Sequence, residues 1–283
     1  MKKQIILFLL LALITGAHAQ TKADRVKLNE MEQSLSVYAH NILNADDVED
    51  RLRADSFFTR NLVQALKLPY SFHHPFDSLK TISRIYAPDS SFRIITWQLM
   101  KDFSYYRYKG AIQLNTKDGS LKLIPLYDGT DFTDNPVDSV RSNQNWIGAV
   151  YYNIILKKYN NKNYYTLLGY DENDARSTKK WIEVLTFDQQ SRPVFGGRYF
   201  SYPNDPIKPA QPAYRFCLEF KKDANAKMNY DPELDLIIFA KLVSETGEIS
   251  KKHTLVPYGT IEGFQWQMGK WVYIPATKLN TVH

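Results

Sequence analysis

Cysteine is almost absent from the sequence. Cys217 is the only one among 283 residues, so no disulfide can form within one chain. The stability of the protein must therefore come from buried apolar surface. A cysteine nucleophile needs a histidine beside it, and the candidate histidines are all distant from Cys217 in sequence: His40, His73, His74 and His253. We expect Cys217 to be a structural thiol.

The short motifs of several large enzyme classes are also missing. The sequence contains no G-x-S-x-G, no H-E-x-x-H, no P-loop and no G-x-G-x-x-G. Basic residues form no continuous run of the kind that lines a nucleic-acid site, and the formal net charge is only +6. Composition therefore argues against a nucleic-acid partner. It favours a protein that binds over one that catalyses, and it implies no organic cofactor.

Only one long apolar run is present, and it lies near the N-terminus. Lys2 and Lys3 precede the unbroken segment Ile5–Ile14. Ala17 and Ala19 are small residues at the third and first positions before the expected cleavage site. This pattern is typical of a Sec-type secretory signal, with cleavage after Ala19. The run is too short to span a bilayer, and no second run of membrane length follows. We expect a soluble protein that starts at Gln20, in the periplasm of a Gram-negative bacterium or secreted from it.

Apolar residues at helical spacing follow the signal. One face is formed by steps of three and four: Leu28, Met31, Leu35, Tyr38 and Ile42. Asp46, with Glu49 three residues later, has the form of a helix N-cap and its capping partner. The second helix should end near Leu66, before Pro69. The sequence predicts a helical hairpin within an N-terminal segment, residues 20–79.

The pattern changes to a period of two from about residue 80. About a dozen strands, joined mostly by short turns, are expected over residues 80–276, with a tail at 277–283. Short connections favour antiparallel neighbours. The prediction is an α+β fold in which the helical hairpin packs on a large antiparallel β-meander. The strand count leaves a sandwich, an open barrel and a small propeller as alternatives.

Two histidines lie in the connection between the helices and the strands. His73 and His74 precede Pro75, so the segment is extended and the two imidazoles point apart. One metal ion is rarely bound by such a pair. We therefore interpret the segment as a connector, with Phe72 and Phe76 packed beneath it.

The densest acidic cluster falls in a loop between two strands. Asp171, Asn173 and Asp174 offer several oxygen ligands of the kind that calcium prefers. The cluster lacks the twelve-residue layout of an EF-hand, and a polar turn that bonds its own backbone explains it equally. A Ca²⁺ site at these residues is the one metal site that the sequence suggests.

Three carboxylates lie inside predicted strands beside aromatic residues. Glu183 shares a strand face with Trp181, and Glu262 shares one with Phe264 and Trp266. Glu219 lies on the same face as Cys217. Two such carboxylates on an aromatic floor would suit glycan binding or hydrolysis. The alternative is that each glutamate pairs with a lysine or arginine across the sheet.

Several phrases of the sequence are similar to those of a known group of proteins. They are found at Ser71-Phe72 with Pro75-Phe76-Asp77, at Phe92-Arg93-Ile94 with Trp97, and at Tyr165–Asp171 followed by Ile182–Phe187. Together they resemble an uncharacterised family of exported proteins of Bacteroidota-type bacteria, and the resemblance covers most of the mature chain. It implies a location in the cell envelope and assigns no catalytic residue.

These observations lead to two functional hypotheses. The first is a non-catalytic binding or assembly module that recognises a protein or glycan of the envelope through an aromatic face, formed by Trp181, Phe264 and Trp266. The second is a glycan-directed hydrolase that uses two of four carboxylates: Asp171, Glu183, Glu219 and Glu262. Such an enzyme needs its two carboxyl groups about 5 Å apart, or about 6.5–9.5 Å apart.

Overall fold

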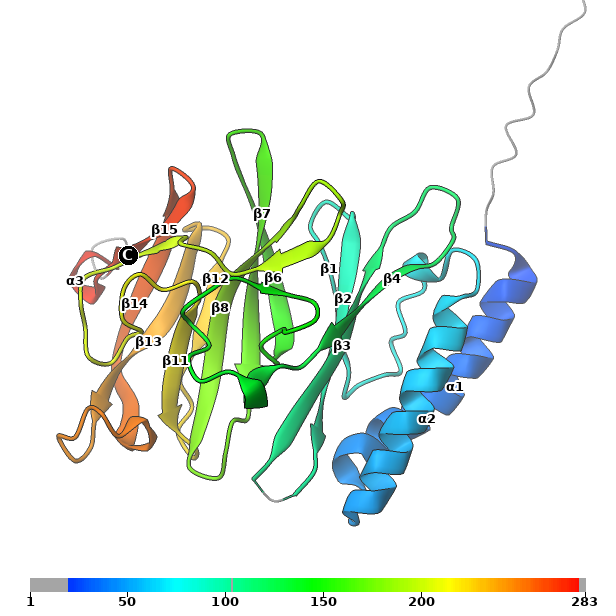
Figure 1. Ribbon diagram of the computed structural model, residues 1–283, viewed down its shortest axis with the longest axis horizontal. Helices are drawn as coiled ribbons and strands as arrows, with labels where there is room; N and C mark the ends of the chain where they lie inside the picture. Colours follow the sequence, from blue (N-terminus) through cyan, green and yellow to red (C-terminus); the bar gives the residue numbers. More distant parts are fainter. Residues whose placement is uncertain (1–19, 103, 280–283) are drawn as a thin grey trace, which may run out of the picture.

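The computed structural model describes residues 20–102 and 104–279, and the expected secretory signal lies outside them. A helical hairpin and three β-sheets are stacked as four layers along the long axis of the molecule (Figure 1). The hairpin covers the first sheet, the second sheet lies in the middle, and the third sheet forms the opposite end. The fold is α+β with antiparallel strands almost throughout, which confirms the predicted class.

The hairpin is formed by two long helices, α1 (Lys22–Asn44) and α2 (Val48–Leu66). Thr21 caps α1 by accepting a hydrogen bond from the Asp24 amide at 3.0 Å. The predicted cap of α2 at Asp46 is wrong by one residue, because Asp47 precedes the helix and makes no side-chain cap bond. Instead, the Asp46 carbonyl accepts a hydrogen bond from the buried Arg51 guanidinium.

The strands follow chain order within the first sheet and are rearranged in the other two. The first sheet is β1 (Ser83–Tyr86), β2 (Phe92–Met100), β3 (Tyr106–Leu114) and β4 (Lys122–Tyr127). The second runs β5 (Arg141–Ser142), β9 (Pro193–Phe195), β8 (Ser177–Phe187), β7 (Lys162–Asp171) and β6 (Val150–Tyr159), and β11 (Phe216–Lys221) also pairs with β8. The third runs β10 (Phe200–Ser201), β15 (Lys270–Ile274), β14 (Leu255–Gln267), β13 (Leu236–Ser244) and β12 (Met228–Asp231).

Each gap between layers holds its own apolar core. Phe58 and Trp97 lie between the helices and the first sheet, Phe92 and Leu185 between the first and second sheets, and Phe216 and Phe264 between the second and third. The middle sheet is therefore buried on both faces. This explains why apolar residues occupy both faces of β8 instead of alternating with polar ones.

The strands of the β region are divided among three open sheets rather than forming one continuous meander. This arrangement takes the place of the sandwich, the open barrel and the small propeller that the strand count left as alternatives. β10 pairs parallel to β15, and this is the one parallel strand pair among the named strands of the described part. Residues 276–279, at the start of the predicted tail, form the short helix α3 (Ala276–Leu279), with Leu279 buried.

The outer edge of β4 is covered along Pro125–Tyr127 by the chain that follows it. The Tyr127 amide donates to the Asn143 carbonyl at 2.8 Å, and the Trp146 amide donates to the Tyr127 carbonyl at 3.0 Å. The Asn143 side chain donates to the Pro125 carbonyl at 3.0 Å. Pro125 has no N–H to offer, as is typical of an edge strand that is protected from pairing.

The connector between the hairpin and the first sheet is fixed by a buried carboxylate. Glu32 of α1 accepts a hydrogen bond from the Ser78 amide at 2.5 Å and pairs with His74 Nε2 at 2.6 Å. Phe72 and Phe76 are buried next to this pair, as the connector interpretation predicts. The two histidines therefore serve the join between layers: His74 faces α1, and His73 ends the short 3₁₀ turn before it.

We expect this carboxylate to make stability depend on pH in acid. Burial raises the pKa of Glu32, but hydrogen bonds from Ser78 and His74 outweigh it, so the pKa lies below its ordinary value of 4.5. Ionised Glu32 therefore stabilises the fold above that value, and the contribution is lost as the pH falls through the lowered pKa. Urea unfolding at about pH 7 and about pH 3.5 should show a smaller acid loss for Glu32→Gln than for the wild type. Glu30→Gln, exposed on the same helix, should keep the wild-type dependence, and equal losses in all three proteins would contradict the assignment.

Candidate functional site

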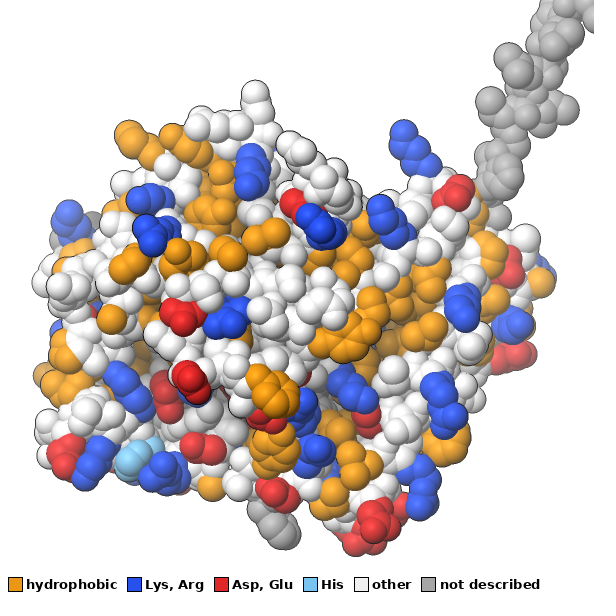
Figure 2. All heavy atoms as spheres, viewed as in Figure 1, with side chains coloured by type: hydrophobic (Ala, Val, Ile, Leu, Met, Phe, Trp, Pro, Cys, Tyr) orange, Lys and Arg blue, Asp and Glu red, His pale blue; other side chains and the backbone are white. Residues whose placement is uncertain are grey.

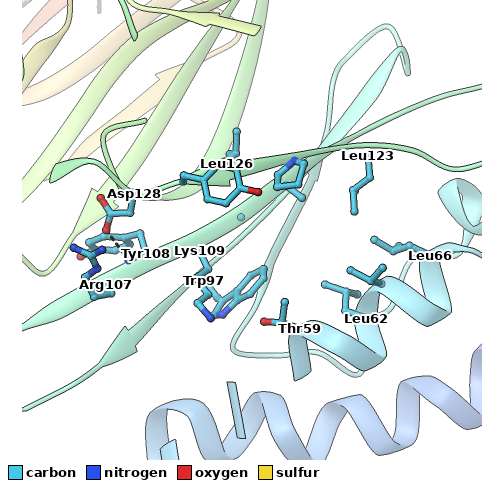
Figure 3. Close-up of a pocket in the computed structure, with 15 residues that line it drawn as sticks. Thr59, Leu62, Leu66, Trp97, Arg107, Tyr108, Lys109, Leu123, Leu126 and Asp128 are labelled. Carbon is cyan, nitrogen blue, oxygen red and sulfur yellow. Dashed lines mark hydrogen bonds between the residues drawn. The ribbon is translucent and has the colours of Figure 1, made fainter. Parts of the chain in front are cut away.

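An apolar hollow lies between α2 and the outer face of β3 and β4 (Figure 3). We call this cavity, of about 470 Å³, the α2–β4 groove. One wall is a single face of α2, formed at helical spacing by Thr59, Leu62, Val63 and Leu66. In Figure 3, Leu62 and Leu66 point toward Leu123 on β4. The groove is therefore bounded by a helix on one side and by the sheet on the other.

The groove exists because the hairpin covers only part of the first sheet. Both helices pack on β2, and β4 lies farther from them at the edge of the sheet (Figure 1). Ala111 of β3 lies opposite Pro125 of β4 in the strand register, and both residues line the groove. Two small side chains side by side leave the floor low where a larger pair would fill it. The hollow thus follows from local sequence choices on two neighbouring strands.

The cations at the end of the groove already have partners. Asp55 is buried, accepts a hydrogen bond from Trp97 Nε1 at 2.9 Å and forms an ion pair with Lys109. Arg107 forms an ion pair with Asp131. Neither cation is left to neutralise an anionic head group, so the groove suits uncharged apolar groups.

One polar atom of the groove has no partner among the described residues. The Thr59 hydroxyl oxygen is buried and makes no hydrogen bond there, although Thr59 lines the cavity. Buried polar atoms are rarely left in this state. A bound group that donates or accepts a hydrogen bond at this point would remove the cost.

Exposed aromatic residues lie at and near the mouth of the groove. Tyr127 lines it and is 53% exposed, and Phe132, next to the Asp131 that pairs with Arg107, is 86% exposed. Figure 2 shows apolar side chains gathered between β4 and the helices, with basic side chains around them. Contiguous exposed apolar surface with a polar rim is typical of an interaction site.

A second, smaller cleft is polar. It has a volume of about 300 Å³ and is lined by Lys179, Trp181, Cys217, Glu219 and Lys252, among others. Lys179 donates to Asn173 at 2.7 Å, and Lys252 donates to two backbone carbonyls at 2.9 Å. These two ammonium groups are therefore already bonded to the protein, and Glu219 is the carboxylate that lies beside them in the lining.

The cysteine in this cleft is not activated as a nucleophile. Burial raises the pKa of the Cys217 thiol above its ordinary value, and the charges that act on it come from lysines and carboxylates. The thiol is protonated at neutral pH, because only a lowered pKa would produce a thiolate there.

Among the strand carboxylates, Glu183 lies in a fully buried ion pair. Its carboxylate accepts a hydrogen bond from Arg215 Nε at 3.0 Å and another from the Tyr151 hydroxyl. Trp146 Nε1 in turn donates to Tyr151 at 2.7 Å. Glu183 shares its face with Trp181, as predicted, but the face is inside the molecule. The interpretation as a cross-strand partner is the one that the structure favours.

The remaining carboxylates also have partners within the protein. Glu262 lies apart on β14, whereas Asp171 and Glu219 flank Lys179 on one face of the middle sheet. Glu262 pairs with Lys208 at 3.0 Å and accepts a hydrogen bond from Tyr273 at 2.5 Å. Glu219 accepts from the Ser177 hydroxyl at 2.6 Å. Asp171 is buried and accepts from the Tyr108 hydroxyl at 2.8 Å. No two of the four carboxylates share a hydrogen-bond partner or an ion pair.

The aromatic residues predicted to bind ligand belong to the core. Phe264 is fully buried between the second and third sheets, and Trp181 is buried except for an edge at the polar cleft. Trp266 packs against Trp271, with ring centroids 5.3 Å apart. The expected aromatic face is therefore not formed by these residues, because Trp181 lies in the middle sheet, which is covered on both faces, and Phe264 and Trp266 of β14 pack in the core between the second and third sheets.

The acidic loop bonds its own chain. Asp171 and Asp174 accept hydrogen bonds from backbone amides, and the Lys179 ammonium donates to the Asn173 side chain. Burial raises the pKa of Asp171, with Lys179 acting in the opposite direction. Within residues 20–102 and 104–279, no group of three or more His, Cys, Asp or Glu is arranged to hold a metal ion.

No protein-family model, curated protein or solved structure matches the chain. Among the described residues, no helix is both long and apolar enough to cross a membrane. The α2–β4 groove is therefore the feature from which a function can be inferred, because the four carboxylates are already bonded within the protein.

Proposed function

We propose that this chain is a non-catalytic binding module of the cell envelope, and that the α2–β4 groove takes apolar side chains of a protein partner. The observation that carries this proposal is the groove itself: a hollow of about 470 Å³ with aliphatic walls and exposed aromatic residues near its mouth. Ligand sites are commonly concave, mostly apolar and of this size.

A protein partner agrees better with the lining than a glycan does. Sugars are held by many hydrogen bonds, yet Asp55, Lys109 and Arg107 are already engaged with the protein. Among the buried polar side-chain atoms of the lining, the Thr59 hydroxyl alone is left without a described partner. Apolar side chains require few such bonds and gain by leaving water.

The alternative of glycan hydrolysis receives no support from the carboxylates. Glu183 and Glu262 are each neutralised by a cation, and both are buried. Such a hydrolase needs a second carboxylate facing the same sugar. The pairs that the sequence suggested do not converge in the groove, whose lining includes none of them.

The groove is expected to bind an uncharged apolar dye, N-phenyl-1-naphthylamine, with enhanced fluorescence. Val63→Glu should weaken this binding about tenfold or more, because it places a carboxylate in an apolar wall. Val37→Glu is the matched control: this valine is on α1 and is 58% exposed. Both changes put a good helix former into a helix, so helix propensity does not separate them.

The pair of variants decides whether the dye reports on the groove. Fluorescence titration, with thermal unfolding to verify that both variants fold, is the measurement. Equal dye affinity in Val63→Glu and the wild type would place the dye elsewhere. A wild-type protein that does not enhance the fluorescence at all would overturn the proposed function.

Export is part of the proposal and has its own test. Expression of the full chain in a Gram-negative host should give a periplasmic protein that begins at Gln20, as measured by intact mass. Ala19→Arg should block the cleavage, because the position before the cut takes a small residue. A wild-type chain that remains unprocessed in the cytoplasm would contradict the assignment.

A further inference from the structure

We infer that the partner segment is an amphipathic α-helix whose apolar face is flanked by acidic side chains, and that it lies beside α2 as a third helix over the first sheet. This inference rests on the proposed function, because it names the occupant of the same groove. It follows from comparing the known ways in which a protein surface holds a peptide with what the groove offers.

Addition of a strand is blocked along the Pro125–Tyr127 part of β4. A strand would have to pair with the outer edge of β4, where Tyr127 is already bonded to Asn143 and Trp146. The Pro125 carbonyl is occupied by the Asn143 side chain, and Pro125 has no N–H to give. A partner must therefore bind through side chains on the face of the sheet, not through backbone pairing at its edge.

Recognition of a polyproline segment or of an anionic motif is also disfavoured. Polyproline ligands lie on exposed aromatic rings, but Trp97 is only 4% exposed and Tyr127 is the one well-exposed aromatic ring in the lining. Anionic motifs are bound by arginines that face the ligand inside the site, whereas both cations of the lining, Arg107 and Lys109, are paired with carboxylates. A helix in a groove is the remaining mode.

The wall of the groove has the dimensions of such a helix. Thr59, Leu62, Val63 and Leu66 extend over eight residues of α2, a rise of two turns or about 10 Å. A partner helix presents anchors over the same length, at spacings of three, four and seven residues. Its apolar side chains would pack against the half-buried Leu123 and the exposed Tyr127 of β4, which line the groove. In Figure 1, this position lies on the β4 side of the hairpin, in the same layer.

The charge of the rim indicates the sign of the partner. Helical geometry places Arg60 and Lys67 next to Val63 on the solvent side of the wall, since they lie three residues before it and four after it. Both are exposed, and neither forms an ion pair with a described residue. Arg60 rests over the Phe57 ring, which holds it at the rim. Acidic residues flanking the apolar face of the partner would meet these two cations.

The unpartnered Thr59 hydroxyl adds a polar point inside the apolar contact. A serine, threonine or tyrosine hydroxyl on the partner helix can bond to it when the surrounding water is removed. One such bond would fix the register of the helix along the groove, because the remaining lining contacts are mostly apolar and tolerate sliding.

The experiment is a competition for the dye in the groove. Three lactam-stapled peptides of about 18 residues are long enough to be helical in water: an amphipathic one with glutamates beside its apolar face, the same with lysines, and one with the first composition scrambled. We expect the acidic amphipathic peptide to displace the dye at a concentration about tenfold lower than the basic one. The acidic peptide is attracted by the two exposed cations of the rim and the basic peptide is repelled by them, and weak exposed charge pairs of this kind together give a difference of that size. The scrambled peptide should not displace it. In the double variant Arg60→Glu with Lys67→Glu, which leaves the wall unchanged, the order of the two amphipathic peptides should reverse.

The outcomes separate this inference from the proposed function. If the dye binds and no peptide displaces it, the helical partner is excluded and the binding groove stands. If the basic peptide displaces the dye as well as the acidic one, or the double variant keeps the wild-type order, the acidic flank is excluded. If the dye does not bind to the wild type, the proposed function itself fails.

Discussion

Replacing Arg215 by methionine is expected to destabilise the protein by about 3–5 kcal/mol, the usual cost of leaving one member of a buried ion pair alone. The change keeps an unbranched side chain in place but leaves the Glu183 carboxylate buried without its cation. The guanidinium also donates to the Ser139 carbonyl at 3.0 Å and to the Phe195 carbonyl at 3.2 Å. Arg215 thus holds the loop after β4 against the middle sheet and ties the end of β9 into that sheet.

The double variant Arg215→Met with Glu183→Gln is the control. Without a charge on either residue, the expected loss in urea unfolding is smaller than for Arg215→Met alone, although the carbonyls that Arg215 served stay unpaired. If Arg215→Met costs less than about 1 kcal/mol, the pair has the low value of a surface ion pair, and the buried assignment is contradicted.

The ion pair of Glu183 and Arg215 shows what a local sequence pattern can predict and what it cannot. The alternation along β8 places Glu183 on the face of Trp181, and this is how the structure has it. The pattern cannot say which layer covers that face. Arg215 lies 32 residues away, and only the pairing of β11 with β8 brings it alongside. A face that seemed suited to a ligand is therefore an internal contact between sheets.

The sequence of β8 contains a signal for the layered arrangement, because apolar residues occupy both faces of this strand. In β8, Ile182 and Val184 face the third sheet while Trp181 and Leu185 face the first. A strand with apolar residues on both faces is typical of a sheet buried on both sides. Helical spacing likewise located α1, because it depends only on neighbours along the chain.

The groove, in contrast, has no local signature. Leu62 and Leu66 look like ordinary core positions of an amphipathic helix, and Ala111 looks like an ordinary strand residue. The hollow appears only when the placement of the hairpin on the first sheet is known, since that placement leaves β4 partly bare. The local feature that comes closest to predicting the hollow is the pair of small residues Gly110 and Ala111, which are adjacent in β3.

The largest cavity effect is expected in the core between the second and third sheets. Phe216 is fully buried, and its ring centroid lies 5.0 Å from those of both Phe239 and Phe264. Phe216→Ala removes these contacts and should cost about 3–5 kcal/mol in urea unfolding, while Phe216→Leu, which keeps most of the volume, should cost much less. Phe132→Ala, at a residue that is 86% exposed, is the control and should change stability by no more than about 0.5 kcal/mol.

The same variant tests whether the layers unfold together. β8 contributes to the cores on both of its faces, so a loss of packing at Phe216 weakens a strand on which the first sheet also depends. Dye binding in the α2–β4 groove and the fluorescence of the buried Trp271 in the third-sheet core should therefore be lost at one urea concentration. If Phe216→Ala loses the tryptophan signal while the groove still binds dye, the hairpin and first sheet form a unit that is stable by itself, and the groove would keep its binding function without the third sheet.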